Sequence, residues 1–527
     1  MPRRQLFKVS AALLAALCAA LAAGCRGGAG GGGGGAAAPR FRAPVVLKVN
    51  AASAPTRQYA SIIQDQLKQV GVPCEIETVE FNTLLDQQRK GQFQMTTGRW
   101  VGGNQDPIYL HDLFRTGAYQ NRGRYSNPEL DKLLDEAVNT FDRPKARELY
   151  VRAQETISRE LPQFPLWYVD QMVVARRNVR NIRVPVDGDW RFLRDVTVEG
   201  GKQGPFVVVL ESNPETLDQL RGTDASSERI RQLVFNSLVR KDEKFDYVGD
   251  LASEIQATPD GLVYTFRLRD GVKFHNGKPF TSADAKYTLD TLLASDSRKA
   301  NDYFEGAGDA RKSNVKAIET PDPLTLVVRL NKPSNKFLSG LVPVGMMPQG
   351  YTTDQQRQAP VGTGAFRFVR YDESQQVIDL AANDAYWGGA PAVRQLRVRT
   401  ILDANTLQAE LRSGGVDLAA VANLQPDTYE ALKQDSNLKV EQFPGVNVVY
   451  LSFNATAEPL NDARVRQAIA YAIDREAIVR ELLLGQARVA HSILPEQSWA
   501  YSAGQTYNFD PAKAQQILDD AGYKAAQ

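Results

Sequence analysis

The pattern of apolar and polar residues changes from strand-like to helix-like and back between residues 45 and 81. Residues 45–50 (VVLKVN) are apolar and β-branched, and residues 74–81 (CEIETVEF) form a second strand-like run. Between them, apolar side chains recur on one helical face until the stop residue Gly71, at Tyr59, Ile62, Ile63, Leu67 and Val70. A strand, a helix and a strand in this order predict a parallel strand pair in an α/β fold.

Two further helices and a long extended run follow. Residues 126–141 and 143–161 repeat apolar positions at helical spacing. Residues 164–177 (FPLWYVDQMVVARR) are apolar and extended, and residues 189–198 (DWRFLRDVTV) predict a last strand. The Gly-rich run EGGKQGP at 199–205 then interrupts the pattern and predicts a short joint.

The remainder of the chain is rich in alternating strands and ends in helices. The strand-like runs are 206–212 (FVVVLES), 262–280, 324–330 (LTLVVRL) and 375–381 (QQVIDLA). Asn276–Gly277 predicts a tight turn within the second of these runs. Residues 462–485 are helical in pattern, and Asp510 followed by Pro511 marks the start of a final helix that ends at Gly522.

Composition places the chain among globular proteins with more than one domain. It has 527 residues, 43% of them hydrophobic, with 63 Lys+Arg against 61 Asp+Glu. Three of the basic residues and none of the acids lie in the first 24 positions, so the rest is close to neutral. That balance lacks the basic footprint of a nucleic-acid-binding protein.

The first 24 residues have the form of an export signal. A basic segment, MPRRQLFK, precedes an Ala-rich apolar stretch that is too short for a good membrane span. The stretch ends at LAAGC, where Cys25 predicts lipidation as at a bacterial lipobox, although Ala22 stands where Leu is usual. Ordinary cleavage after small residues is the alternative, and Sec and twin-arginine export both stay open. The Gly-rich residues 26–44 predict a tether about 25 Å long.

The motifs of common enzyme classes are absent from the sequence. It contains no GxSxG, GxxxxGK[ST], HExxH or CxxC. The three histidines, His111, His275 and His491, are far apart. With Cys25 lipidated, Cys74 has no partner for an intramolecular disulfide and is expected to be a buried free thiol. We therefore expect a binding protein without catalytic residues, metal or cofactor.

A long segment resembles the family-5 extracellular solute-binding proteins of ABC importers, which include oligopeptide-, dipeptide- and nickel-binding proteins. The resemblance begins with residues 251–293 (LASEIQATPDGLVYTFRLRDGVKFHNGKPFTSADAKYTLDTLL) and continues through PVGTGAFRFV, NDAYWGGAPAV, LRSGGVDLAAV and YLSFNATAEPLNDARVRQAIAYAIDREAIV. Earlier in the chain, GRYSNPELDKLLDEA and LPQFPLWYVDQMVVARRNVRNI resemble the family's C-terminal portion. The resemblance implies an α/β fold of the two-lobed periplasmic binding protein type (type II), with the ligand between the lobes.

The order of these segments is that of a circular permutant. In the family, a helix like DPAKAQQILDDAGYKAAQ runs into a strand like APVVLKVN, whereas here these are the last segment and the first after the tether. An assembly or design artefact is the alternative. The predicted divisions are a signal peptide at 1–24, the lipidated Cys and tether at 25–44, a split lobe at 45–163 and 421–527, and a continuous lobe at 164–420 that contains the joint.

The resemblance also supplies candidate ligand-binding residues in the loop after residue 99. In the family's peptide-binding members, a Trp is followed three positions later by an Asp that pairs with the peptide's α-ammonium. Trp100 matches the Trp, but the Asp position is Gly103, which offers no anion to a buried ammonium. Asn104 and Asp106 stand close by in the same loop. Trp100 is either a stacking platform or a core residue, and Asp106 has a structural alternative.

Two further candidates, Thr223 and Asn454, fall where the family's two lobes face the cleft, as contacts or as scaffold. The sequence thus predicts a monomeric, membrane-anchored lipoprotein outside the cytoplasm. It would capture a short peptide or another polar solute and deliver it to the permease subunits of an ABC importer. A ligand sensor on the same fold, and a ligand such as a sugar or a metal chelate, stay open.

Overall fold

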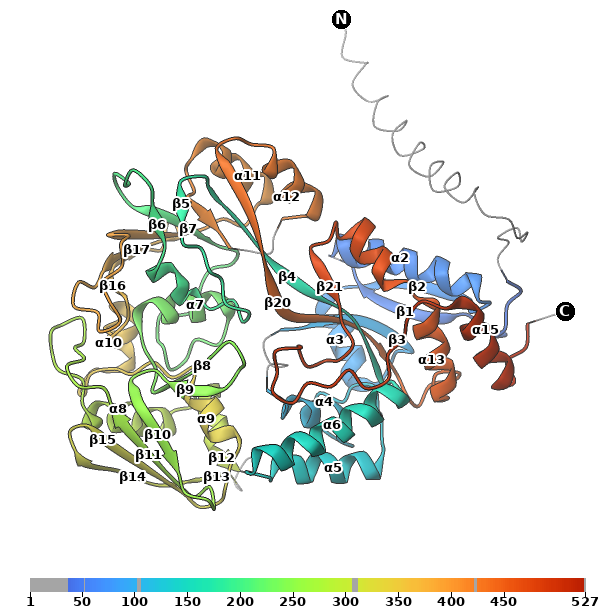
Figure 1. Ribbon diagram of the computed structural model, residues 1–527, viewed down its shortest axis with the longest axis horizontal. Coiled ribbons are helices and arrows are strands. Elements are labelled where there is room, and N and C mark those ends of the chain that lie inside the picture. The colour runs from blue at the N-terminus through green and yellow to red at the C-terminus, as the bar shows by residue number, and fades with distance from the viewer. Residues whose placement is uncertain (1–36, 52, 102–105, 306–310, 421–423, 526–527) are drawn as a thin grey trace, which may run out of the picture.

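The computed structural model describes residues 37–51, 53–101, 106–305, 311–420 and 424–525. Its largest element is an 11-stranded mixed sheet that runs through the whole molecule (Figure 1). In spatial order the sheet contains β16 (Phe366–Asp372), β17 (Val377–Ala382), β18 (Gln395–Thr400), β7 (Phe206–Leu210), β19 (Leu418–Ala419), β4 (Gln163–Arg176), β20 (Leu438–Phe453), β3 (Met95–Trp100), β1 (Val45–Asn50) and β2 (Cys74–Val79), with β21 (Ala487–Val489) paired to β4.

The long strands β4 and β20 pair in antiparallel fashion and connect the two lobes seen in Figure 1. Their ladder is irregular between Phe443 and Asn447 of β20. We call the part formed by residues 176–438 the continuous lobe. The part formed by residues 37–163 and 453–525 is called the split lobe.

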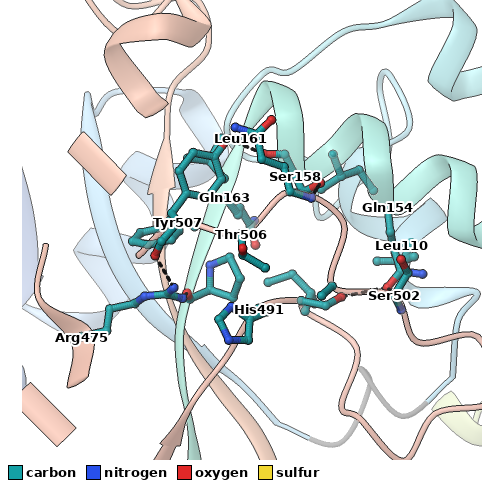
Figure 2. A pocket seen from close by; sticks show the side chains of 17 residues that line it. Leu110, Gln154, Ser158, Leu161, Gln163, Arg475, His491, Ser502, Thr506 and Tyr507 are labelled. Carbon is teal, nitrogen blue, oxygen red and sulfur yellow. Dashed lines mark hydrogen bonds between the residues drawn. The ribbon is translucent and has the colours of Figure 1, made fainter. Parts of the chain in front are cut away.

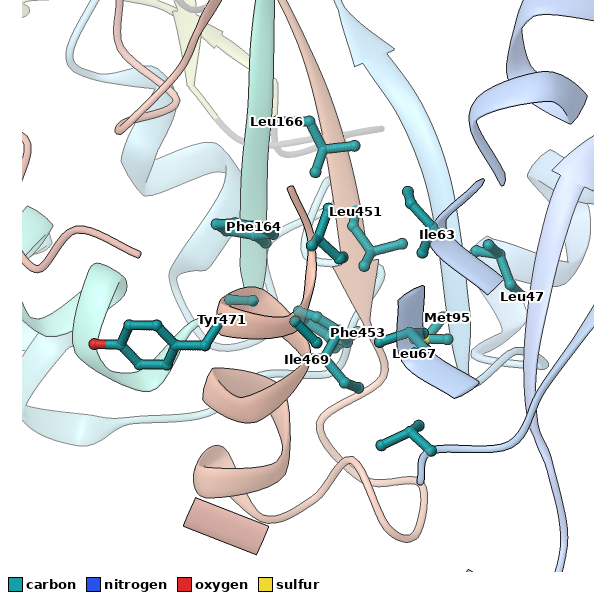
Figure 3. Packing of buried hydrophobic residues seen from close by; sticks show 14 of the residues in the cluster. Leu47, Ile63, Leu67, Met95, Phe164, Leu166, Leu451, Phe453, Ile469 and Tyr471 are labelled. Carbon is teal, nitrogen blue, oxygen red and sulfur yellow. The ribbon is translucent and has the colours of Figure 1, made fainter. Parts of the chain in front are cut away.

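In the split lobe, helices cover the sheet and close a core around its central strands. Alternate residues of β1 are fully buried, as expected for a strand with one face on a core. Figure 3 shows Ile63 and Leu67 of the helix α2 facing the same core as Leu451 and Phe453 of β20. Strands β1 and β2 pair in parallel, so the predicted strand–helix–strand unit is confirmed.

The continuous lobe contains a second sheet. It is antiparallel, and its strands are, in spatial order, β10 (Ala252–Ala257), β11 (Val263–Leu268), β15 (Thr325–Leu330) and β14 (Val315–Asp322). Phe266, Leu326 and Val328 from this sheet lie in a core of their own. Three two-stranded pairs complete the strands: β5 (Val179–Arg180) with β6 (Thr197–Val198), β8 (Val239–Lys241) with β9 (Tyr247–Gly249), and β12 (Phe304–Glu305) with β13 (Lys312–Ser313).

The helices begin at the signals that the sequence provides. In α15, Asp510 accepts a hydrogen bond from the Lys513 amide at 2.9 Å, and Pro511 occupies the first turn, as predicted. The α-helices are α2 (Ala54–Gln69), α3 (Phe81–Lys90), α4 (Tyr109–Phe114), α5 (Pro128–Val138), α6 (Arg143–Glu160), α7 (Ala225–Val234), α8 (Ser282–Leu293), α9 (Lys336–Leu341), α10 (Thr353–Gln358), α11 (Ala404–Ser413), α12 (Pro426–Lys433), α13 (Ala463–Ala472), α14 (Arg475–Ala477) and α15 (Pro511–Asp520).

The segment before β1 packs against the segment after α15. Arg40 pairs with Asp519 and donates a hydrogen bond to the Tyr523 carbonyl at 2.9 Å. The Phe41 and Tyr523 rings meet edge to face, with their centroids 5.0 Å apart. Strand β1 is separated from β20 only by β3, so the first and the last long strands of the split lobe lie in one sheet.

Two expected elements differ from the structure. Residues 189–198 form a 3₁₀ turn, Trp190–Arg194, and only the two-residue strand β6. The Asp189 carboxylate accepts a hydrogen bond from the Arg191 amide at 2.7 Å and thereby favours a turn over a strand. The helical pattern predicted for 462–485 breaks at Ile473, whose backbone is extended, and resumes after Asp474 caps the next turn.

Candidate functional site

Trp100, the last residue of β3, is enclosed by other side chains. Its ring stacks on Tyr450, with centroids 4.8 Å apart, and meets Tyr109 edge to face at 5.6 Å. The Arg122 guanidinium lies 5.6 Å from the ring centre, and the indole N–H donates to Gln163 Oε1 at 3.0 Å. Only 7% of the residue is exposed. This environment favours the core role for Trp100 over that of an open stacking platform.

Asp106 reaches from the split lobe to the continuous lobe. One carboxylate oxygen accepts a hydrogen bond from the Ile108 amide at 3.1 Å, which fixes the side chain against its own loop. The other oxygen accepts a hydrogen bond from the hydroxyl of Tyr247, the first residue of β9. The neighbouring candidates Gly103 and Asn104 lie outside the described residues.

Charged residues of the continuous lobe surround this contact. The Lys241 ammonium lies 5.7 Å from the centre of the Tyr247 ring. Burial lowers the pKa of Lys241, while the negative charges of Asp106 and Asp187 act in the opposite direction. The Lys241 ammonium therefore feels carboxylates from both lobes at once, as a residue at a junction between lobes would.

Asp187 keeps an exposed surface but is surrounded by protein on its other sides. Burial, followed by repulsion from Asp189, raises the pKa of Asp187 to about 6. Its loop is fastened to the connecting strands, because Gln171 of β4 donates hydrogen bonds to the carbonyls of Pro185 (2.7 Å) and Pro444 (3.3 Å). Asp187 thus lies next to the irregular part of the β4–β20 ladder.

The structure separates Asn454 from these residues. Asn454 is buried and donates hydrogen bonds to the carbonyls of Gly91 and Phe93, both at 2.9 Å, while its Oδ1 accepts from Thr456. It follows Phe453, which pairs with the first residue of β3, whereas Trp100 is the last. The two candidates are therefore roughly 20 Å apart along the strand. The side-chain bonds of Asn454 support its scaffold alternative.

Thr223 is exposed in the loop before α7, one residue before the N-cap Asp224. The structure thus brings together Trp100 and Asp106 in one region but does not join Asn454 to them. Sequence reasoning missed Lys241, Tyr247 and Asp187. Lys241 and Tyr247 flank the turn of the β8–β9 hairpin and Asp187 lies in a turn, and no local signal tells which turns face the opposite lobe.

A small cavity lies inside the split lobe, beside the start of β4 (Figure 2). Its volume of about 20 Å³ has room for about one water molecule. Arg475 beside it is buried and donates to the carbonyls of Pro165 (2.8 Å) and Tyr507 (2.7 Å), and burial lowers the pKa of Arg475 to about 10. His491 Nδ1, which also borders the cavity, has no hydrogen-bond partner. The cavity is too small for a peptide or sugar.

The glycines of PVGTGAF serve close packing. A side chain at Gly362 would place Cβ 2.2 Å from the Val234 carbonyl oxygen, and one at Gly364 would meet the Leu233 carbonyl oxygen at 2.5 Å. The loop is held by His275, whose Nε2 lies 3.0 Å from the Gly364 carbonyl oxygen. His275 therefore links the Asn276–Gly277 turn to this loop, which explains both features structurally.

Within the described ranges, no group of three or more His, Cys, Asp or Glu side chains is placed to hold a metal ion. In the same part of the chain, no helix has both the length and the apolar character needed to span a bilayer. Cys74 is a free thiol there, as expected, but it is half-buried and not fully buried; loss of solvent contact, with a smaller effect of Glu75, raises its pKa to about 12. The predicted lipidation residue, Cys25, lies outside the described residues.

A family model described as "Bacterial extracellular solute-binding proteins, family 5 Middle" matches residues 22–122 and 246–527. A Brucella ovis protein named as an ABC transporter peptide-binding protein is 35% identical over 300 residues, 55% of each chain. The dipeptide-binding protein of Escherichia coli is 30% identical over 335 residues, 59% of this chain and 61% of the relative. The chain thus spans only about 55–61% of the length of the curated relatives that it matches.

The chain is also similar to a protein with another named ligand and to a solved structure. Heme-binding protein A of Haemophilus influenzae is 32% identical over 315 residues, covering 55% of this chain and 57% of the relative. Among solved structures, HbpA2 of Haemophilus parasuis superimposes with a TM-score of 0.52 at 26% identity, over 61% of this chain and 67% of that one. The two-lobed α/β fold agrees with this neighbour.

Proposed function

The chain belongs to the bacterial extracellular solute-binding proteins of family 5, and from that membership we propose that it captures a peptide-like or other polar solute between its lobes and delivers it to an ABC importer. The observation that carries the proposal is the family match on both sides of residues 123–245, in a chain whose lobes are connected by β4 and β20. Family 5 comprises transport binding proteins, so the role is binding and not catalysis.

We place the ligand site where the lobes face each other around Asp106, Tyr247, Lys241 and Asp187. Asp106 and Lys241 come from different lobes, and each has a charge that a polar solute can match. Asp187 adjoins the β4–β20 irregularity through Gln171. A change of lobe angle there would alter the distance between these groups, which is the property a closing binding site needs.

The lobes of this proposal meet within β4 and β20, which refines the divisions predicted at residues 163 and 420. Leu424 and Leu432 pack in one cluster with Val174 of β4 and Leu411 of α11. Residues beyond 420 therefore continue the packing of the continuous lobe up to β20. On this view β20 carries the second connection between the lobes.

We infer the class of ligand from the names of relatives together with the residues of the loop after β3. Names of relatives include peptide-binding, dipeptide-binding and heme-binding proteins, so family membership alone allows several ligand classes. Gly103 in place of an ammonium-binding Asp favours a peptide with a blocked N-terminus, a sugar or a chelate over a simple free-amine peptide. Asp106 lies three positions after Gly103, and hydrogen bonds from the Ile108 amide and the Tyr247 hydroxyl already orient its carboxylate.

Anchoring by a lipid on Cys25 and a circularly permuted order are part of the same proposal. Arg40 contacts Asp519 and Phe41 contacts Tyr523. These contacts support the permuted order, because they bring the segment before β1 next to the last helix, α15. At the other junction, Lys202 in the Gly-rich joint pairs with Asp417, with Nζ 2.5 Å from Oδ2. A joint held in this way fits a short connection between β6 and β7.

A thermal-shift screen tests the function. Peptides with free and acetylated N-termini, sugars, heme and metal chelates are added separately, because a ligand that binds only the folded state raises the unfolding midpoint. We expect at least one class to stabilise the wild-type protein and to do so less in an Asp106→Ala, Lys241→Ala double variant. Stabilisation that is equal in both proteins would move the site elsewhere. Uptake of the identified ligand by cells with and without the permease subunits of a candidate importer tests delivery.

A further inference from the structure

The two lobes touch through a set of polar side chains that is separate from the long connecting strands. Tyr247 of β9 donates its hydroxyl hydrogen to Asp106, and the preceding residue, Asp246, pairs with Arg143 at the start of α6. Both contacts on the continuous lobe come from one element, the β8–β9 hairpin. In the split lobe they come from the segment between β3 and α6.

A second pair of contacts comes from the start of α9. The side-chain amide of Asn335 donates a hydrogen bond to the Val138 carbonyl at the end of α5. The next residue, Lys336, has its ammonium 3.8 Å from Asp112 Oδ1 of α4. The β8–β9 hairpin and α9 are neighbours in the continuous lobe (Figure 1), so these contacts belong to one face.

The chemistry of this face suits reversible contact. The side chains of Arg143 and Asp246 are 48% and 31% exposed, and those of Lys336 and Asp112 are 45% and 38% exposed. Such pairs are weak and are screened by salt. A permanent domain interface would instead bury a large apolar area. Here the apolar contribution includes Phe141, which lies against Gly261.

The hairpin itself is firmly held in its own lobe. Asp242 Oδ1 accepts hydrogen bonds from the amides of Lys244 (2.8 Å) and Asp246 (2.9 Å), and Phe245 between them is only 3% exposed. The turn therefore keeps its shape when the lobe moves as a body. Asp246 and Tyr247 then meet or leave the split lobe together.

We propose that the β8–β9 hairpin and the start of α9 form an interlobe latch, which favours the closed arrangement of the lobes before any ligand is bound. This inference rests on the proposed function. Contacts that exist only in the closed arrangement raise its population, and a ligand that binds the closed arrangement then binds more tightly. The Arg143–Asp246 pair is the outer part of the latch, since neither residue belongs to the ligand site proposed above.

A charge exchange at this pair tests the latch without any ligand. Asp246→Arg places two guanidinium groups together, and Arg143→Asp does the same with two carboxylates. Each single variant should lower the ratio of closed to open protein by about two- to fivefold, the effect expected for an exposed pair. Small-angle X-ray scattering should then show a larger radius of gyration. The double exchange, Arg143→Asp with Asp246→Arg, should restore the wild-type value.

The matched control is Glu319→Arg, which breaks the exposed Arg329–Glu319 pair inside the small sheet of the continuous lobe. It should leave the radius of gyration unchanged. Raising the salt concentration from about 0.01 M to about 1 M should increase the radius of gyration of the wild-type protein towards that of the single variants. The reason is that salt screens the attraction between the charged side chains over a shorter distance. Thermal unfolding identifies a variant that fails to fold. If one of the two single variants, Asp246→Arg or Arg143→Asp, does not fold, the other one provides the test.

The latch is overturned if both single variants scatter like the wild-type protein, or if the double exchange fails to restore the wild-type value. Because the scattering is measured without ligand, the result does not depend on what the protein binds or transports. A negative thermal-shift screen would count against the proposed function and leave the scattering result standing.

Discussion

Arg40 and Asp519 are 479 positions apart in the chain, and their side chains form an ion pair with 2.5 Å between Nη1 and Oδ1. The Arg40 side chain is only 6% exposed, and its Nε also donates to the Val70 carbonyl at 3.0 Å. One side chain therefore fastens the segment before β1 both to the end of α2 and to the end of α15.

Arg40→Ala should lower the free energy of unfolding by about 1–3 kcal/mol, because the substitution leaves charged and carbonyl partners without their donor. Chemical unfolding followed by circular dichroism measures the loss. Arg42→Ala is the control, since Arg42 is exposed two residues away and should change stability by less than about 0.5 kcal/mol. Equal effects of the two substitutions would show that Arg40 is not a fastening point.

A chain in the proposed family order should also fold. It would start at Gly204, run to Tyr523, continue through a linker of about 4–6 residues to Arg40 and end at Val198. Because Phe41 and Tyr523 are already in contact, the new connection spans little space. We expect the same circular dichroism spectrum and the same ligand profile as for the present order. An insoluble or molten product under matched conditions would contradict the proposed permuted order.

His275 should make stability depend on pH. Burial, assisted by Arg367, lowers the pKa of His275 to about 4, although the hydrogen bond to the Gly364 carbonyl acts the other way. Between pH 6.5 and 4 the unfolded chain therefore binds a proton that the folded protein rejects. The stabilising contribution is complete above about pH 6.5 and is lost as the pH falls.

Urea unfolding at pH 7 and pH 5 measures this effect. The wild-type protein should lose about 1–2 kcal/mol more than His275→Gln between the two values, since Gln carries no titrating group. His111→Gln, a substitution at a half-buried position beside Asp135, serves for comparison. If wild type and His275→Gln lose the same amount, the His275 ring does not titrate as described.

Elements with strong local signals could be predicted from the sequence. Alternate burial of β1, the apolar face of α2 and the Asp510–Pro511 start of α15 each depend on neighbours a few residues away. The strand predicted for residues 189–198 is wrong. Their apolar content suggests a strand, whereas one hydrogen bond from the Arg191 amide to Asp189 favours a turn. A short polar cap decided the outcome against composition.

The candidate site could be predicted only in part, because its partners come from distant segments. The sequence offers Trp100 and Asp106 as candidates, but the burial of Trp100 depends on Tyr450, and the partner of Asp106 is Tyr247, 141 positions away. The bonds of Asn454 to Gly91 and Phe93 likewise link separate parts of the chain. Pairings at such separations are set by the packing of the lobes, and the local sequence around each residue does not predict them.

Cys25→Ser should release the protein from membranes without changing its fold. Loss of an acyl anchor removes the hydrophobic attachment, and in the sequence Cys25 comes before the Gly-rich residues 26–44. Cell fractionation measures the distribution. Cys74→Ser is the matched control and should remain with the membrane fraction. A wild-type protein that is already soluble would show that Cys25 carries no lipid.

The last prediction concerns Gly103 and ligand charge. A ligand ammonium buried without an anion costs several kcal/mol, and each 1.4 kcal/mol is tenfold in affinity. Hydrogen bonds from the Ile108 amide and the Tyr247 hydroxyl hold the Asp106 carboxylate against its own loop and the opposite lobe. We therefore expect simple free-amine dipeptides to bind weakly to the unmodified protein and at least tenfold more tightly to Gly103→Asp.

Isothermal titration calorimetry with a free-amine dipeptide and its N-acetyl form provides the measurement. Gly103→Asn is the control, because it adds nearly the same volume without the charge. The gain should appear for Gly103→Asp alone and should vanish with the acetylated peptide, since acetylation removes the ammonium. Tight binding of the free dipeptide by the unmodified protein would mean that another carboxylate supplies the charge. Asp106, three positions after Gly103, would then be the first residue to substitute.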